Sequence, residues 1–194
     1  MKRSLLLYTA LLLPLGGCGY NGLVSADEQV KAAWAQVENV YQRRADLIPN
    51  LVATVKGSAK HEETVLQEVT TARASATQVH VSADDLTDPA KMKAFEEAQA
   101  KLSASAIGRL LVSNENYPKL QANGQFTDLM KQLEGTENRI LRARQQYNES
   151  VKDYNSELGK IRGAVVNKAT GTPFKPRVYF SASPESTAAP KVSF

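Results

Sequence analysis

Apolar residues recur at alternating spacings of three and four from Asp27 to about Val79. Of the 14 positions in this seam, 11 are apolar, where the 42% apolar content of the chain would give about six. This excess predicts an amphipathic helix with coiled-coil-like packing, for which Ser25 or Asp27 is a suitable N-terminal cap. The seam positions are Val30, Trp34, Val37, Tyr41, Arg44, Ile48, Leu51, Val55, Ser58, Glu62, Val65, Val69, Ala72 and Ala76.

Pro49 interrupts this run and leaves two outcomes open. The helix ends at Ile48 and restarts with Pro49 in its first turn, or it continues through Pro49 with a kink. The seam keeps its phase across the proline, which favours the kink. A continuous helix of this length would reach roughly 80 Å at 1.5 Å per residue.

Two further helices are predicted downstream of a polar connection from His80 to Pro89. Asp88 before Pro89 is a favourable start for a helix that runs to about Asn116. Asn123-Gly124 precedes a third helix of about 38 residues, in which nine of 11 seam positions are apolar. These positions are Phe126, Met130, Leu133, Glu137, Ile140, Arg144, Tyr147, Val151, Tyr154, Leu158 and Ile161.

The C-terminal part of the chain changes character after this helix. Residues Gly171–Phe180 contain two prolines and a Val-Tyr-Phe cluster, which indicates an extended segment that docks on the bundle. Residues 181–194 have the composition of a disordered tail. The predicted fold is all-α, an elongated up-and-down bundle of three to four long antiparallel helices within residues 27–180, the first kinked at Pro49.

The N-terminus predicts export and a lipid anchor. Lys2 and Arg3 precede an apolar stretch of about a dozen residues, too short for a membrane-spanning helix of roughly 20. Leu15-Gly16-Gly17-Cys18 then matches a bacterial lipobox, and the alternative is an ordinary leader followed by a chance cysteine. We expect a signal peptide at residues 1–17, a lipidated Cys18 and a linker at residues 18–26. The chain would be held at the cell membrane or outer membrane, with its domain on the extracytoplasmic side.

Composition and charge exclude some classes of function. Cys18 is the only cysteine, so the exported domain has no disulfide and depends on helix packing. Of the 24 basic residues, Lys2 and Arg3 lie in the leader, which leaves 22 against 20 acidic residues. This balance gives no reason to expect nucleic-acid binding.

Sequence motifs for catalysis are incomplete or absent. His61-Glu62 begins the pattern of a zinc protease, but Val65 stands where the second histidine is needed. The chain contains neither the paired Glu-x-x-His motifs of di-iron bundles nor a Gly-x-Ser-x-Gly elbow. We therefore expect no enzymatic activity, no metal and no cofactor.

Charged residues inside the seams are the most informative polar feature. Arg44 and Glu62 interrupt the first seam, and Glu137 and Arg144 interrupt the last. Helical rise separates the first two by about 27 Å and the last two by about 10 Å. At most one of the cross-helix pairs, Arg44 with Glu137 or Glu62 with Arg144, is therefore expected in a regular register.

Two interpretations of these charges remain open. They fix the helix register or reach solvent on their long side chains, or they form a polar patch that binds a partner. Three neighbours of Arg44 join the candidate interaction residues. Arg43 and Asp46 lie three residues apart near one helix face, and Asn50 follows Pro49.

The sequence around these residues resembles the LemA family. Residues 42–52 read Gln-Arg-Arg-Ala-Asp-Leu-Ile-Pro-Asn-Leu-Val, and further similarity extends from about Tyr20 to Phe180. Two departures stand out. A lipobox replaces the usual N-terminal membrane helix, and Ile161-Arg162-Gly163 stands where the family tends to have Phe-Pro. Other matching stretches are Gly135–Ile140, Tyr147-Asn148, Tyr154-Asn155 and Tyr179-Phe180.

The resemblance implies an all-helical, membrane-tethered envelope protein, and it supplies no reaction. Together with the predicted anchor, it favours a non-catalytic protein-interaction module in the bacterial envelope. The alternatives are a structural spacer or oligomer of the envelope, or a binder of a cell-wall or small-molecule ligand. The expected partners are the membrane through lipidated Cys18 and an unidentified envelope protein, and a homo-oligomer is possible.

Overall fold

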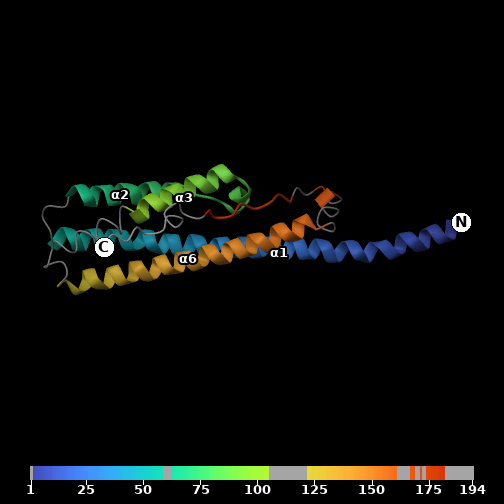
Figure 1. The fold of residues 1–194 in the computed structure, drawn as a ribbon, viewed down its shortest axis with the longest axis horizontal. Helices are drawn as coiled ribbons and strands as arrows, with labels where there is room; N and C mark the ends of the chain where they lie inside the picture. The colour runs from blue at the N-terminus through green and yellow to red at the C-terminus, as the bar shows by residue number, and fades with distance from the viewer. Residues whose placement is uncertain are drawn as a thin grey trace, which may run out of the picture.

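Four α-helices lying side by side make up most of the described structure. In the computed structural model, α1 spans Lys2–Ser58, α2 spans Glu63–Gln78, α3 spans Pro89–Ser103 and α6 spans Gly124–Gly159, with a 3-10 turn η1 at Ala83–Thr87. The predicted all-α, elongated bundle is confirmed (Figure 1). The structure describes residues 2–58, 63–104, 122–160, 167–168, 171 and 174–181.

Helices α1 and α6 form an antiparallel spine along the long axis of the molecule. The 57 residues of α1 extend for roughly 85 Å at 1.5 Å per residue. Helices α2 and α3 are antiparallel to each other and lie on one side of the spine, over the C-terminal half of α1 (Figure 1). The N-terminal end of α1 projects past the end of α6 (Figure 1).

The core follows the apolar seams and divides into two clusters. One cluster is centred on Trp34, whose ring lies 5.4 Å from Phe95, 5.5 Å from Tyr147 and 5.9 Å from Phe180, measured between centroids. Edge-to-face and stacked aromatic pairs at these distances add to the free energy gained by burial. The second cluster joins α1 to α2, α3 and α6 through Ile48, Leu51, Val55, Leu66, Val69, Ala72, Ala76, Leu102, Phe126 and Leu133.

The prediction of one helix from Asp27 to Val79 is wrong at both ends. Helix α1 already begins at Lys2, so neither Ser25 nor Asp27 caps it, and it ends at Ser58. Helix α2 is folded back against α1 (Figure 1). The seam is polar at Ser58 and Glu62, so a straight extension would have little apolar surface to bury, whereas the folded-back α2 buries its apolar face against α1.

Helix α1 continues through Pro49, so the alternative in which it ends at Ile48 is wrong. Proline lacks a backbone N–H, and the carbonyl four residues earlier, that of Ala45, loses its helical donor. The Nε of Arg73 in α2 donates a hydrogen bond of 2.7 Å to this carbonyl. Pro49 therefore creates an acceptor on α1 that a side chain of α2 uses to dock.

The predicted starts of the other two helices are confirmed. The Asp88 carboxylate accepts hydrogen bonds from the backbone N–H groups of Ala90 and Lys91 at the start of α3. The Asn123 side chain caps α6 in the same way. The connection from His80 to Pro89 was predicted to be polar, but two of its residues, Val81 and Leu86, are buried in the core. The predicted continuation towards Asn116 lies outside the described residues.

Residues 174–181 have no helical structure and lie against the bundle, as the sequence predicts. Gly171, shortly before them, adopts a φ of 63°, a left-handed conformation that favours glycine. Phe180 is buried among the aromatic rings around Trp34. Ser181 is the last described residue, so the predicted disordered tail otherwise lies outside the described residues.

The link between Pro49 and Arg73 can be tested by a double-mutant cycle. We expect Arg73→Ala to lower the free energy of unfolding by about 1.5–3 kcal/mol, because it leaves the Ala45 carbonyl without its charged donor. Pro49→Ala restores a helical N–H, so Arg73→Ala should cost clearly less in that background. Urea unfolding measures all four chains, with exposed Arg43→Ala as the control, and additive effects would contradict the link.

Candidate functional site: two buried charge clusters

Arg44 occupies a seam position of α1 and is 2% exposed. Its Nη1 donates a hydrogen bond of 3.1 Å to Glu137 of α6 and another to the hydroxyl of Ser103 in α3. Its Nη2 donates to the side-chain oxygen and to the backbone carbonyl of Gln99, the latter at 3.2 Å. The guanidinium also lies 4.9 Å from the ring centre of Tyr41. One buried charge therefore joins three helices.

Gln99 extends this cluster to the fourth helix. Its Nε2 donates a hydrogen bond of 3.1 Å to the backbone carbonyl of Ala76 in α2. The Nε of Arg44 is the one buried side-chain polar atom without a partner among the described residues. We call Arg44, Gln99, Ser103 and Glu137 the arginine cluster. Its helices can slide past one another only by breaking charge-assisted hydrogen bonds.

The other predicted site residues lie in different environments. Arg43, Asp46 and Asn50 are exposed on the opposite face of α1 from the core. The Asp46 carboxylate accepts a hydrogen bond of 2.8 Å from Gln42. Glu62 lies outside the described residues. The structure therefore brings Arg44 and Glu137 together and leaves the exposed three apart from them.

Arg144 binds the C-terminal segment. Its Nη2 donates a hydrogen bond of 2.8 Å to the carbonyl of Ser181, and its guanidinium lies 4.8 Å from the ring centre of Phe180. Of the two cross-helix pairs considered in the sequence, Arg44 with Glu137 forms. The other pair includes Glu62, which lies outside the described residues, so it stays a prediction.

A second buried ion pair escaped the sequence analysis. Asp27 of α1 is 7% exposed and accepts hydrogen bonds of 2.6 and 3.2 Å from the Nη2 and Nε of Arg177. Lys31 lies 3.0 Å from the other carboxylate oxygen. The Nη1 of Arg177 donates to the carbonyl of Ala83 at 2.9 Å. The pair ties the C-terminal segment to both α1 and η1.

Burial opposes the ionisation of Asp27, because it removes the carboxylate from water. The hydrogen bonds and charges of Arg177 and Lys31 together outweigh this effect, so the pKa of Asp27 lies below its ordinary value. Burial also raises the pKa of Tyr147 and Tyr154. These two hydroxyls stay protonated and donate to the carbonyls of Val178 and Lys175, at 2.9 and 3.2 Å.

Asparagine side chains bind the backbone of the C-terminal segment at every third residue. Asn148 donates to the carbonyl of Phe180 and accepts from its N–H, at 3.2 and 2.9 Å. Asn155 does the same for Arg177 at 2.9 and 2.8 Å. Asn167 binds Phe174 in this way at 3.0 and 2.9 Å. A sequence signal for two of these residues exists, because the dipeptide Tyr-Asn recurs seven residues apart at 147 and 154.

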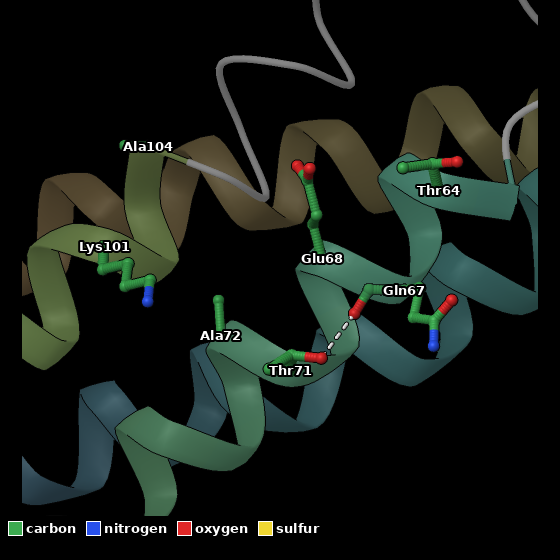
Figure 2. A pocket seen from close by; sticks show the side chains of 7 residues that line it. All are labelled: Thr64, Gln67, Glu68, Thr71, Ala72, Lys101 and Ala104. Atoms are coloured by element: carbon green, nitrogen blue, oxygen red, sulfur yellow. Dashed lines mark hydrogen bonds between the residues drawn. The ribbon is translucent and has the colours of Figure 1, made fainter.

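A cavity of about 590 Å³ lies between α2 and α3. The Thr71 hydroxyl donates to the Gln67 carbonyl of its own helix at 2.9 Å (Figure 2). Lys101 of α3 lies across the cavity from the side chains of α2 (Figure 2). The lining residues are Thr64, Gln67, Glu68, Thr71, Ala72, Lys101 and Ala104.

Two features are absent from the described part of the chain. No helix there is both long and apolar enough to cross a membrane. No three or more His, Cys, Asp or Glu side chains there are grouped so that they could hold a metal ion.

Removing Arg44 should destabilise the bundle far more than removing its exposed neighbour. We expect Arg44→Ala to lower the free energy of unfolding by at least about 3 kcal/mol, because it leaves Glu137 and Gln99 without their donor. Arg43→Ala should cost well under about 1 kcal/mol. Urea unfolding of both variants measures the difference, and equal stabilities would show that the arginine cluster contributes little to folding.

The lowered pKa of Asp27 predicts an acid-sensitive contribution to stability. As the pH falls, the unfolded carboxyl takes up a proton first, near its ordinary value of about 4. The stabilisation is therefore complete above that pH and is lost as the pH falls through the lower, folded-state pKa. Thermal melts from pH 7 to pH 3 should show Asp27→Asn approaching wild type as the pH falls. Exposed Asp153→Asn serves as the control, and a constant gap for Asp27→Asn would contradict the assignment.

Comparison with known proteins identifies related sequences. Two proteins of Paramagnetospirillum magneticum, magnetosome protein MamQ 1 and magnetosome protein MamQ 2, are each 26% identical to this chain in an alignment of 181 residues that covers 85% of this chain and 65% of theirs. Magnetosome protein MamQ of Magnetospirillum gryphiswaldense is 27% identical over the same share. The chain thus spans 65% of the length of these curated relatives.

The family model gives the broader relationship. The LemA model matches residues 33–194, which include the C-terminal part of α1 from residue 33 onward, the other described helices and the C-terminal segment. This range covers most of the chain and contains both buried charge clusters except Asp27 and Lys31. The chain belongs to the LemA family.

Proposed function

We propose that this protein is a lipid-anchored, non-catalytic interaction module of the bacterial envelope. Membership of the LemA family supports a membrane-associated protein. The lipobox at Leu15–Cys18 supports a lipid as the means of attachment. The names of the MamQ relatives place those proteins in magnetosomes, and their role is not carried over to this chain.

The continuity of α1 is the observation that carries the proposal. The helix runs from Cys18 into the core without a break. Leu23, which is fully buried, follows Cys18 by five residues, or roughly 8 Å of helix. A lipid on Cys18 would thus hold the bundle close to the membrane surface on a helix, and the proposed orientation is extracytoplasmic.

The buried polar side chains are used within the fold, so a partner would have to bind elsewhere on the surface. Arg44 and Gln99 bind other helices, and Asp27 binds the C-terminal segment. These side chains are committed to holding elements together. Large apolar side chains on the surface offer contact points for a partner instead, because Leu141 is 55% exposed and Tyr179 is 45% exposed.

Acylation of Cys18 is the direct test. In cells grown with an alkyne analogue of palmitate, the wild-type chain should be labelled and should fractionate with membranes. Cys18→Ser removes the thiol that carries the lipid, so it should lose the label and leave the membrane-anchored fraction. Ser25→Ala, a change of similar size on the same helix, is the control and should keep both properties. Equal labelling of Cys18→Ser and wild type would refute the anchor.

A further inference from the structure

The C-terminal segment is bound the way a groove binds an extended peptide. It runs antiparallel to α6, since Asn155 holds Arg177 and Asn148 holds Phe180. Seven residues of helix separate the two asparagines, a rise of about 10.5 Å. Three residues of extended chain separate their partners, a span of about 10 Å. The repeat of the helix surface therefore matches the repeat of an extended chain.

The contacts of the groove divide into backbone and side-chain recognition. Asn148 and Asn155 bind only backbone N–H and C=O groups, which every residue except proline carries. The hydroxyls of Tyr147 and Tyr154 also bind backbone carbonyls. An extended chain of almost any sequence satisfies these contacts, so they set direction and register but not identity.

Two side-chain pockets determine which sequence the groove binds. Asp27, with the carbonyl of Ala83, receives the guanidinium of Arg177. The rings of Trp34, Phe95 and Tyr147 surround Phe180, which is 4% exposed. Between them, Val178 packs partly buried against the core, and Tyr179 is 45% exposed and contributes little. The groove therefore selects an arginine followed three residues later by a phenylalanine.

The length of the connection to α6 sets how far the segment can reach from its own bundle. Seven residues, 160–166, separate the end of α6 from Asn167, which is bound to Phe174 by two hydrogen bonds, and such a length spans up to about 24 Å when extended. A groove left empty would expose the aromatic rings around Trp34 and leave the carboxylate of Asp27 without Arg177. Both costs favour refilling the groove with a segment of the same chemistry.

We propose that the surface formed by α1, η1, α3 and α6 is a binding site for an extended Arg-x-x-Phe segment, and that a second copy of this chain supplies it by exchange. The inference deepens the proposed interaction function and rests on it. The second copy is the chosen source because it carries residues 174–181, the one segment seen to fit. Copies anchored in one membrane also meet at high local concentration, which favours exchange between chains.

A complementation experiment tests the exchange. One full-length chain carries Arg177→Ala and Phe180→Ala, so its groove is intact and its segment is disabled. The other full-length chain carries Asn148→Ala and Asn155→Ala, so its segment is intact and its groove is weakened. The two chains, with different tags, are co-expressed and solubilised in mild detergent. We expect the complementing pair to be captured about tenfold more than either variant with itself, equivalent to about 1.4 kcal/mol of pairing preference.

A peptide of residues 171–184 provides an independent readout. Trp34 is the only tryptophan in the chain, so its fluorescence reports whether the aromatic pocket is filled. Added to the full-length Arg177→Ala, Phe180→Ala chain, the wild-type peptide should shift this fluorescence towards that of the wild-type chain. The Tyr179→Ala peptide should act alike, and the Phe180→Ala and Arg177→Ala peptides should fail. If circular dichroism shows that the double variant is unfolded, full-length Arg177→Ala replaces it.

The outcomes separate the inference from the function on which it rests. Failure of the complementing pair to co-purify beyond the self-pairs overturns the exchange, even where the peptide binds. Equal binding of all four peptides overturns the Arg-x-x-Phe specificity. The peptide readout uses purified protein and does not depend on Cys18, whereas co-capture is measured on chains co-expressed in one membrane. If the wild-type chain is acylated but both tests fail, only this inference is overturned. If the wild-type chain is not labelled, the proposed lipid anchor is wrong.

Discussion

The guanidinium of Arg44 is the constraint around which the bundle is arranged. A charge that is 2% exposed is tolerated only where partners replace the water it has lost. Those partners come from α3 and α6, and Gln99 connects them to α2. An apolar seam alone would allow the helices to shift by a turn at moderate cost. The hydrogen-bond directions of one guanidinium allow far fewer arrangements.

Asp27 sets a second fixed point on the same helix. It lies 17 residues before Arg44, or roughly 25 Å along α1. Arg44 fixes α1 against its neighbouring helices, whereas Asp27 fixes it against the C-terminal segment through Arg177. Two charges of opposite sign on one helix thus hold different elements. Each would cost free energy if its own partner were missing, so neither partner can exchange for the other.

Pro49 and the C-terminal segment show how unsatisfied backbone groups organise this fold. The proline leaves the carbonyl of Ala45 without its helical donor, and Arg73 of α2 donates a hydrogen bond to that carbonyl. The extended segment has backbone groups that no sheet satisfies, and Asn148 and Asn155 bind them from α6. In both places a side chain from a distant part of the sequence supplies the missing partner. Helical packing thus depends on polar groups as much as on the apolar seams.

Local signals in the sequence determined most of the secondary structure. The seams predicted the faces of α1 and α6, while Asp88-Pro89 and Asn123-Gly124 located the starts of α3 and α6. These features act within a few residues of one another, so they are readable without the fold. The pairing of Arg44 with Glu137 was partly readable, because helical rise limits which seam charges can meet.

Tertiary structure alone decided where the first seam folds back and what fills the groove. The seam keeps its phase from α1 into α2, so its periodicity does not tell a straight helix from a folded one. The burial of α2 against α1 distinguishes the folded arrangement from the straight one. Asp27 and Arg177 are 150 residues apart in the chain, and no local pattern marks them as partners. Their contact exists because docking of the extended segment brings a buried carboxylate and a guanidinium together, and the free energy of that contact belongs to the assembled fold.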